Sequence, residues 1–116
     1  MNFPLYNNLK QNLTKKDLTI AEKEDFMAAL ADIDENARDL IYVLIQCYRL
    51  EHDPGNENFI PYKGTEMNTS EGSSTIYWNL LEFPIPLRHI LYKFITMNRE
   101  KLVDERRRKE AVPDAL

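Results

Sequence analysis

Few side chains of this sequence are of the types, and at the spacings, that could do chemistry. Its two histidines, His52 and His89, lie far apart, with no Cys or Asp at the spacing of a metal site. The one cysteine, Cys47, lies among apolar residues, where a thiol is more often buried and inert than nucleophilic. The sequence contains no Ser-His-Asp set, HExxH motif or Gly-rich phosphate loop. It therefore predicts neither an enzyme nor a metal or cofactor site, and it favours a binding role.

The most basic run of the chain consists of Arg106, Arg107, Arg108 and Lys109. Consecutive cations could contact phosphate groups or form a nuclear signal. The acidic residues Asp104, Glu105 and Glu110 dilute this charge, so a solvated helix tail is the favoured interpretation. Tyr77 and Trp78 could stack on bases, but the acidic segment around them would repel a polyanion. We therefore expect at most a weak contact with nucleic acid, through the basic run.

Length and charge are those of one globular domain. The chain has 116 residues and a net charge of −4, which fits a single core. Residues 51–82 contain six acidic residues and one lysine, whereas residues 83–116 contain eight basic and five acidic residues. The middle of the chain therefore favours a basic partner. A lone cysteine, no signal peptide and no apolar run of membrane-spanning length lead us to expect an intracellular protein without membrane contact.

The stretch from Glu35 to Leu50 is the most apolar of the chain and is predicted to be its central helix. Apolar residues recur there at helical spacing, and further ones widen the face beyond a surface stripe, as in a helix with a buried position. The residues of this face are Ala37, Leu40, Ile41, Leu44 and Tyr48, widened by Val43, Ile45 and Cys47. We expect the flanking segments to pack against this helix.

Two helical segments are expected before the central helix. Residues 1–17 form an N-terminal arm in which Pro4 begins a short helix. Thr19-Ile20-Ala21-Glu22 is a capping box, which starts a helix that runs to about Ala31. Asp32 or Asp34 then caps the central helix. The expected buried stripe of the second helix consists of Phe26, Met27, Leu30 and Ile33.

After a turn at Pro54-Gly55, two short strands are predicted at residues 59–62 and 75–80, and they could pair as a hairpin across the polar loop 63–74. Pro61 lacks an N–H, so the first strand must be an edge. Alternation along the second strand places one set of side chains on each face. The two sets are Ile76, Trp78 and Leu80 on one face, and Thr75, Tyr77 and Asn79 on the other, with Tyr77 the more exposed.

A further helix is expected to begin near Pro86. Its apolar stripe consists of Leu87, Ile90, Leu91, Phe94 and Ile95, with Arg88 and His89 mainly outside it. The helix should continue to about Glu110 and project from the core, because only Leu102 and Val103 are apolar there. The predicted organisation is an arm over residues 1–17, a helical domain over residues 18–103 and a charged tail over residues 104–116.

Three short motifs, taken in this order, resemble the extra-terminal (NET) domain of the bromodomain and extra-terminal chromatin proteins. Residues 18–23 (Leu-Thr-Ile-Ala-Glu-Lys) are similar to the opening of that domain, and residues 38–46 are similar to its second helix, an apolar run that ends on Gln. Residues 86–95, which open Pro-Leu-Arg, resemble its third helix. Two departures are clear: the strand before the third helix alternates acidic and apolar residues in the family, whereas residues 74–79 keep only the apolar ones, and the polar loop 63–74 is longer than the family's.

The resemblance implies a mainly α fold: a three-helix bundle with a short strand or hairpin between its second and third helices, here with an N-terminal arm and an extended C-terminal helix. It also implies a module of chromatin or transcription regulators that binds a peptide of alternating apolar and basic residues by strand addition. Such a module works in the nucleus or at another site of transcription, including one formed by a virus. The expected peptide-binding residues are Tyr42, Ile45, Ile76, Trp78 and Leu80 for apolar contact, with Glu66, Glu71 and Glu82 for charge selection.

Two further hypotheses accompany this interpretation. Residues 59–62 could occupy the strand-addition site of their own chain. Alternatively, the protein could be a structural component of a virion or another large assembly, in which the N-terminal arm and the C-terminal helix hold neighbouring molecules. Apolar residues of the arm, Phe3, Leu5, Tyr6 and Leu9, fit that second role.

Overall fold

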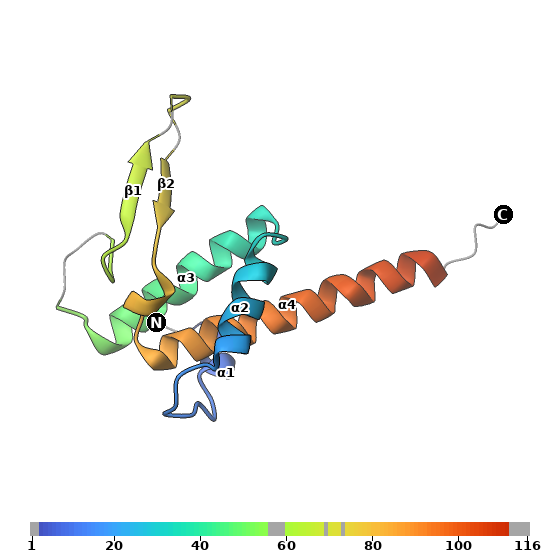
Figure 1. Cartoon of the computed structure of the whole chain (residues 1–116), viewed down its shortest axis with the longest axis horizontal. Helices are drawn as coiled ribbons and strands as arrows, with labels where there is room; N and C mark the ends of the chain where they lie inside the picture. Colours follow the sequence, from blue (N-terminus) through green and yellow to red (C-terminus); the bar gives the residue numbers. More distant parts are fainter. Residues whose placement is uncertain (1–2, 56–59, 69, 73, 112–116) are drawn as a thin grey trace.

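The computed structural model describes residues 3–55, 60–68, 70–72 and 74–111. The chain is mainly helical, with a two-stranded antiparallel hairpin between its third and fourth helices, as the sequence predicts (Figure 1). In chain order the elements are α1 (Pro4–Leu9), α2 (Ile20–Leu30), α3 (Glu35–His52), β1 (Thr65–Asn68), β2 (Ser74–Tyr77), the 3-10 turn η1 (Leu80–Glu82) and α4 (Ile85–Ala111).

The starts of α2 and α3 follow directly from their capping residues. The Thr19 N–H donates to the Glu22 carboxylate at 2.9 Å, and the Glu22 N–H donates to the Thr19 hydroxyl at 3.1 Å, so the predicted capping box is confirmed. Of the two candidate caps for α3, Asp34 is the one used: its carboxylate accepts from the Ala37 N–H at 2.8 Å.

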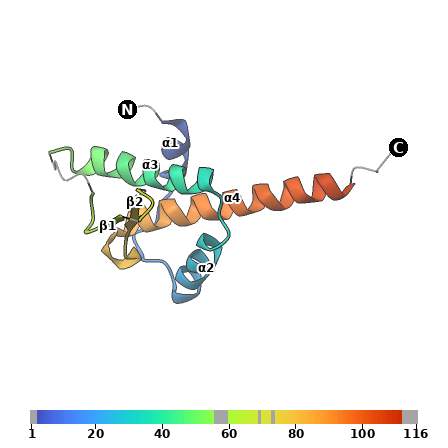
Figure 2. The ribbon, with the colours of Figure 1, turned by 90° about the horizontal axis from the view of Figure 1, so that it is seen from above.

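The core lies between α3 and α4, which run side by side in opposite directions (Figures 1 and 2). The predicted stripe of α4 is confirmed, since all five of its residues are buried. The predicted face of α3 is buried at Ala37, Leu44, Ile45, Cys47 and Tyr48 and half-buried at Leu40 and Ile41, whereas Val43 is 37% exposed. Of the three residues predicted to widen that face, Ile45 and Cys47 are therefore buried and Val43 is not.

Helix α2 packs across α4 rather than lying along it (Figure 1). Phe26 is buried there, and Leu30 and Ile33 are half-buried. The expectation that Met27 is buried is wrong, because its side chain is 57% exposed. The steep crossing explains this, since a crossing helix covers a shorter length of its neighbour than a parallel one does.

Helix α1 is part of the same core. Tyr6 and Leu9 are buried, and Phe3 and Leu5 pack against the core cluster. The Tyr6 hydroxyl donates to the Glu51 carboxylate at 3.3 Å, and the Lys10 ammonium lies 2.7 Å from the same group, so α1 is held at the end of α3. The apolar side chains of the arm therefore pack against their own chain. An assembly role would need these side chains at the surface.

The first strand of the hairpin lies six residues later than the sequence predicts, at Thr65–Asn68 instead of residues 59–62. Residues 60–62 form a bend and a turn, and β1 begins at Thr65, inside the predicted loop; Phe59 lies outside the described residues. Tyr62 and Lys63 have φ of 55° and 58°, which no strand accommodates. The second strand is confirmed at Ser74–Tyr77, but residues 80–82 turn into η1 instead of continuing it.

Candidate functional site

An open apolar groove of about 680 Å³ lies between α2, α3 and the hairpin. Five of the eight residues predicted to bind a peptide line it together: Tyr42, Ile45, Ile76, Trp78 and Leu80. Phe26, Leu30, Ile41 and Leu91 add apolar surface from α2, α3 and α4. Side chains far apart in the sequence thus form one continuous apolar surface. Such a surface could bind an apolar ligand and remove it from water.

Strand β2 borders this groove along one of its edges. The residues that line the groove include the consecutive positions Thr75, Ile76, Tyr77 and Trp78, whose side chains alternate between the two faces of the strand. A groove lined by side chains from both faces of a strand runs along the edge of that strand, because neither face alone presents all four residues. No residue of β1 lines the groove. The edge of β2 that faces the groove is therefore the one opposite β1.

That edge has no partner strand in the described part of the chain. The sheet contains only β1 and β2, paired antiparallel with Thr65 opposite Tyr77 and Met67 opposite Thr75. No backbone hydrogen bond joins β2 to any other described segment. A strand edge of this kind offers N–H and C=O groups to another extended chain.

Trp78 holds the end of β2 against the helices. Its ring centroid lies 6.2 Å from that of Tyr42 on α3 and 6.0 Å from that of Phe83 after η1. Its indole N–H donates to the Pro61 carbonyl oxygen at 2.7 Å. The alternation predicted from the sequence is confirmed, since Ile76, Trp78 and Leu80 are half-buried while Thr75, Tyr77 and Asn79 are exposed.

A tight turn over Pro61–Gly64 shapes the other side of Trp78. The Gly64 N–H donates to the Pro61 carbonyl at 3.2 Å, and both central residues have positive φ, as in a type I′ turn. A Cβ at position 64 would overlap the indole of Trp78 and the side chain of Ile60, so only glycine fits there. The idea that residues 59–62 occupy the strand-addition site is wrong for residues 60–62, which neither pair with β2 nor line the groove.

The three acidic residues predicted to select charge do not line the groove. Glu66 is exposed on β1, Glu71 lies in the turn between the strands, and Glu82 in η1 lies 3.7 Å from the Lys63 ammonium. The charged residues that do line the groove are Glu35, Arg38 and Asp39, from the start of α3. Sequence reasoning missed them because they flank the apolar face of α3 and carry no motif.

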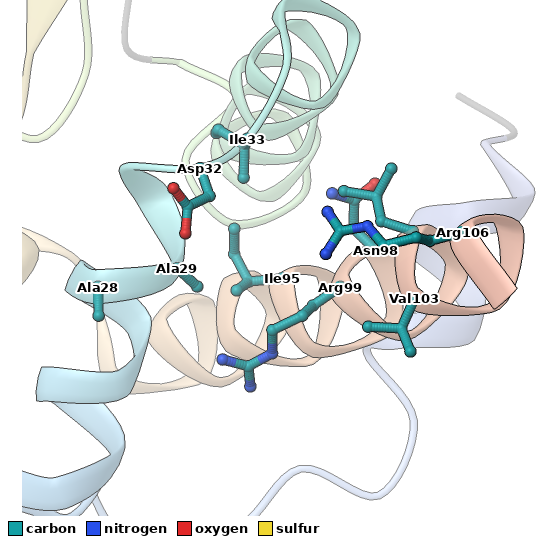
Figure 3. Close-up of a pocket in the computed structure, with 10 residues that line it drawn as sticks. Ala28, Ala29, Asp32, Ile33, Ile95, Asn98, Arg99, Val103 and Arg106 are labelled. Atoms are coloured by element: carbon teal, nitrogen blue, oxygen red, sulfur yellow. The ribbon is translucent and has the colours of Figure 1, made fainter. Parts of the chain in front are cut away.

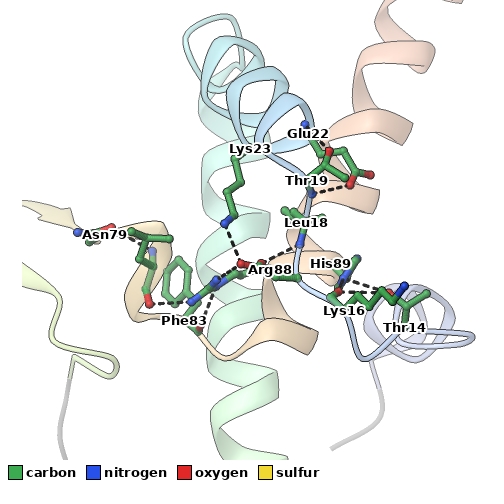
Figure 4. Close-up of polar contacts among 12 residues, drawn as sticks. Thr14, Lys16, Leu18, Thr19, Glu22, Lys23, Asn79, Phe83, Arg88 and His89 are labelled. Atoms are coloured by element: carbon green, nitrogen blue, oxygen red, sulfur yellow. Dashed lines mark hydrogen bonds and ion pairs between the residues drawn. The ribbon is translucent and has the colours of Figure 1, made fainter.

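Arg88, near the start of α4, binds both the η1 region and the segment just before α2 (Figure 4). Its guanidinium donates to the carbonyl oxygens of Phe83 at 2.9 Å and Leu81 at 2.7 Å, and to the Asp17 carboxylate at 2.8 Å. The Arg88 side chain is only 11% exposed, although the sequence placed it outside the apolar stripe. The signal that could have located it is its position one turn after a Pro-containing bend, where free carbonyl groups accumulate.

Two carboxylates on the α2 side have lowered pKa values. The Lys23 ammonium, at 2.7 Å, and the Arg88 guanidinium lower the pKa of Asp17 to about 2. The Arg99 guanidinium binds both oxygens of Asp25 at 2.9 Å, the Tyr92 hydroxyl donates to the same group, and the pKa of Asp25 is also lowered to about 2. These contacts fix α2 on α4 and so fix one wall of the groove.

The remaining reactive side chains are Cys47 and the two histidines. Among residues whose placement is described, no group of three His, Cys, Asp or Glu residues could hold a metal ion. Cys47 is buried, which raises the pKa of its thiol. His89 contacts the Lys16 carbonyl and the Thr14 hydroxyl (Figure 4). His52 stacks on Tyr48. Within the described residues, no helix is both long and apolar enough to cross a membrane.

The comparisons with known proteins found no family model, no curated protein and no solved structure that matches this chain.

Proposed function

We propose that this chain is a protein-interaction module that binds a short extended peptide by adding it as a strand to the free edge of β2. The observation that carries the proposal is the position of that edge, which borders an apolar groove lined by Tyr42, Ile45 and Trp78. Main-chain hydrogen bonds to β2 would supply affinity, and every second side chain of the guest would enter the groove.

The groove favours a guest with alternating apolar residues. Its floor consists of aliphatic and aromatic side chains, and alternate guest residues pointing at it would remove apolar surface from water on both sides. Guest residues between them would face outward, on the side of Thr75 and Tyr77. Glu35 and Asp39 line the groove and would favour a basic guest side chain that reaches the start of α3, while Arg38 opposes it.

The resemblance to the NET domain gives this proposal its biological setting. It implies that the guest belongs to a transcription or chromatin partner and that the module works in the nucleus or at a viral site of transcription. The lysine preference of that family depends on strand acids, and the groove here replaces them with residues from α3. Charge selection should therefore be weaker than the requirement for apolar residues.

Calorimetric titration with a peptide of alternating isoleucine and lysine tests the proposal. We expect binding to be lost on Ile76→Asp, which places a charge in the groove, and to persist on Met67→Asp. Met67 lies on the same hairpin, is 57% exposed and does not line the groove, so it is a matched control. If both variants lost peptide binding equally, or if neither lost it, binding would lie outside the groove.

A further inference from the structure

We infer that a second copy of this chain docks in the groove between α2 and the distal half of α4, forming a two-fold symmetric, antiparallel contact. This groove, of about 520 Å³, lies on α4 beyond the peptide groove, with which it shares only Ile33 among the described lining residues, and its proposed role is independent of peptide binding. Its apolar lining includes Ala28, Ile33, Ile95, Leu102 and Val103 (Figure 3).

The groove lies on a face of α4 that continues the core stripe. Ile95, Asn98, Leu102 and Arg106 follow one another at helical spacing; Ile95 is buried, Asn98 and Leu102 are half-buried, and Arg106 is exposed. Beyond Ile95, α4 extends past the other helices (Figures 1 and 2). Val103 is 40% exposed on this projecting part. An exposed helical face that continues a buried one is a surface for a partner helix.

The charges at the two ends of this surface indicate which partner fits. The wall from α2 ends in Asp32, and α2 has no basic residue in its last turn, so its terminal carbonyl groups add to the negative charge there. The tip of α4 carries the basic run that begins at Arg106, with Arg107 and Arg108 also exposed. Neither Asp32 nor Arg106 forms an ion pair with another described residue.

An antiparallel second copy brings these opposite charges together. With the two-fold axis near Leu102 and Val103, the partner's Arg106 would lie about 5 Å before the axis along this copy's α4, at the level of Arg99 and within the groove that Asp32 also lines. Arg99 does not oppose it strongly, because its guanidinium is already bound to both oxygens of Asp25. The same contact repeats on the other side of the axis, as an isologous interface requires.

Figure 3 shows Asp32 on the α2 side of the groove and Arg106 on the α4 side. Both are exposed, so a neighbour can reach them. The apolar centre is small, and the expected dimer is therefore weak and sensitive to salt. Sedimentation equilibrium of the whole chain, from about 10 µM to about 1 mM, covers the affinity range of such interfaces. We expect the wild-type chain to dimerise in this range and the dissociation constant to rise with salt.

A charge-exchange experiment tests the geometry. Asp32→Arg alone and Arg106→Asp alone each place like charges in contact twice, and each should raise the dissociation constant by about tenfold or more. An equimolar mixture of the two variants restores both ion pairs and should dimerise about as well as the wild-type chain. Both positions are exposed, so circular dichroism and peptide binding should not change.

Three results would overturn the inference. They are a wild-type chain that stays monomeric throughout the range, a dimer that either single variant leaves intact, and a mixture that stays monomeric while the wild-type chain dimerises. Peptide binding in the first groove is measured in the same samples. Failure of dimerisation with peptide binding retained would reject this contact alone.

Discussion

Trp78 donates its indole N–H to the carbonyl oxygen of Pro61 at 2.7 Å, across 17 positions of the chain. The same carbonyl accepts the Gly64 N–H, so one oxygen fixes both the turn before β1 and the residue after β2. The two strands contact each other far more than they contact the helices, and Figure 1 shows the hairpin extending away from them. The direction of the free edge of β2 therefore depends on this contact.

Gly64→Ala should destabilise the fold, whereas Gly55→Ala should not. The added methyl group at position 64 overlaps the Trp78 indole and Ile60, while nothing lies within 4 Å of a Cβ at position 55. We expect the free energy of unfolding to fall by about 2 kcal/mol for Gly64→Ala and by less than about 0.5 kcal/mol for Gly55→Ala. Urea unfolding followed by circular dichroism measures both. Equal effects would show that the turn does not press on Trp78.

Trp78→Ala should release the hairpin without unfolding the helices. The substitution removes the hydrogen bond to Pro61 and the ring contacts with Tyr42 and Phe83, but the core between α3 and α4 stays intact. We expect hydrogen exchange of the β1 and β2 amides to speed up while that of the α3 and α4 amides changes little. Tyr77→Ala, at a 57% exposed neighbouring position, is the control and should leave hairpin exchange slow.

Arg88→Met should cost far more stability than Arg107→Met on the same helix. Arg88 is nearly buried and donates to two carbonyl groups and one carboxylate, and methionine keeps the length of its chain while removing every donor. We expect a loss of about 2–4 kcal/mol for Arg88→Met, the range for leaving buried partners of a charge unpaired. Arg107 is exposed, and its replacement should change the free energy of unfolding by less than about 0.5 kcal/mol. Similar values for the two would contradict the role assigned to Arg88.

Stability should fall as the pH is lowered from about 4 towards 2. Asp17 and Asp25 have native pKa values of about 2, lowered from the ordinary value of 3.8, so the folded chain binds fewer protons than the unfolded chain in this range. Their contribution is complete above the unfolded pKa and is lost as the pH falls through the native one. The double variant Asp17→Asn/Asp25→Asn should therefore show a flatter dependence of the unfolding midpoint on pH. A dependence as steep as that of the wild-type chain would assign the loss to other carboxylates.

The sequence was sufficient for the features that depend on local rules. The capping box at Thr19, the apolar stripe of α4 and the alternation from Thr75 to Asn79 each follow from side-chain type and helix or strand spacing, and each is confirmed. The apolar groove residues Ile45 of α3 and Ile76 of β2 were predicted from the sequence, whereas Glu35, Arg38 and Asp39 of α3 carry no motif and were missed.

The features that the sequence did not reveal depend on contacts between distant segments. The first strand was placed too early because the positive φ values of Tyr62 and Lys63 are stabilised by the Pro61–Trp78 contact, which no local pattern shows. Met27 is exposed because α2 crosses α4 steeply. Arg88 is nearly buried because carbonyl groups of η1 and the carboxylate of Asp17 converge on it.

The most direct test of strand addition is the amide spectrum of the chain during titration with an alternating isoleucine–lysine peptide. The account predicts that the amide signals of Thr75, Ile76 and Tyr77 shift together with those of Tyr42 and Ile45, and that amide exchange in β2 slows. It also predicts that a peptide N-methylated at alternate backbone positions on one edge, which cannot donate hydrogen bonds there, loses this effect. Shifts confined to β1 or α1 would contradict the account. So would two peptides, one N-methylated on each edge, that both bind as well as the unmethylated peptide.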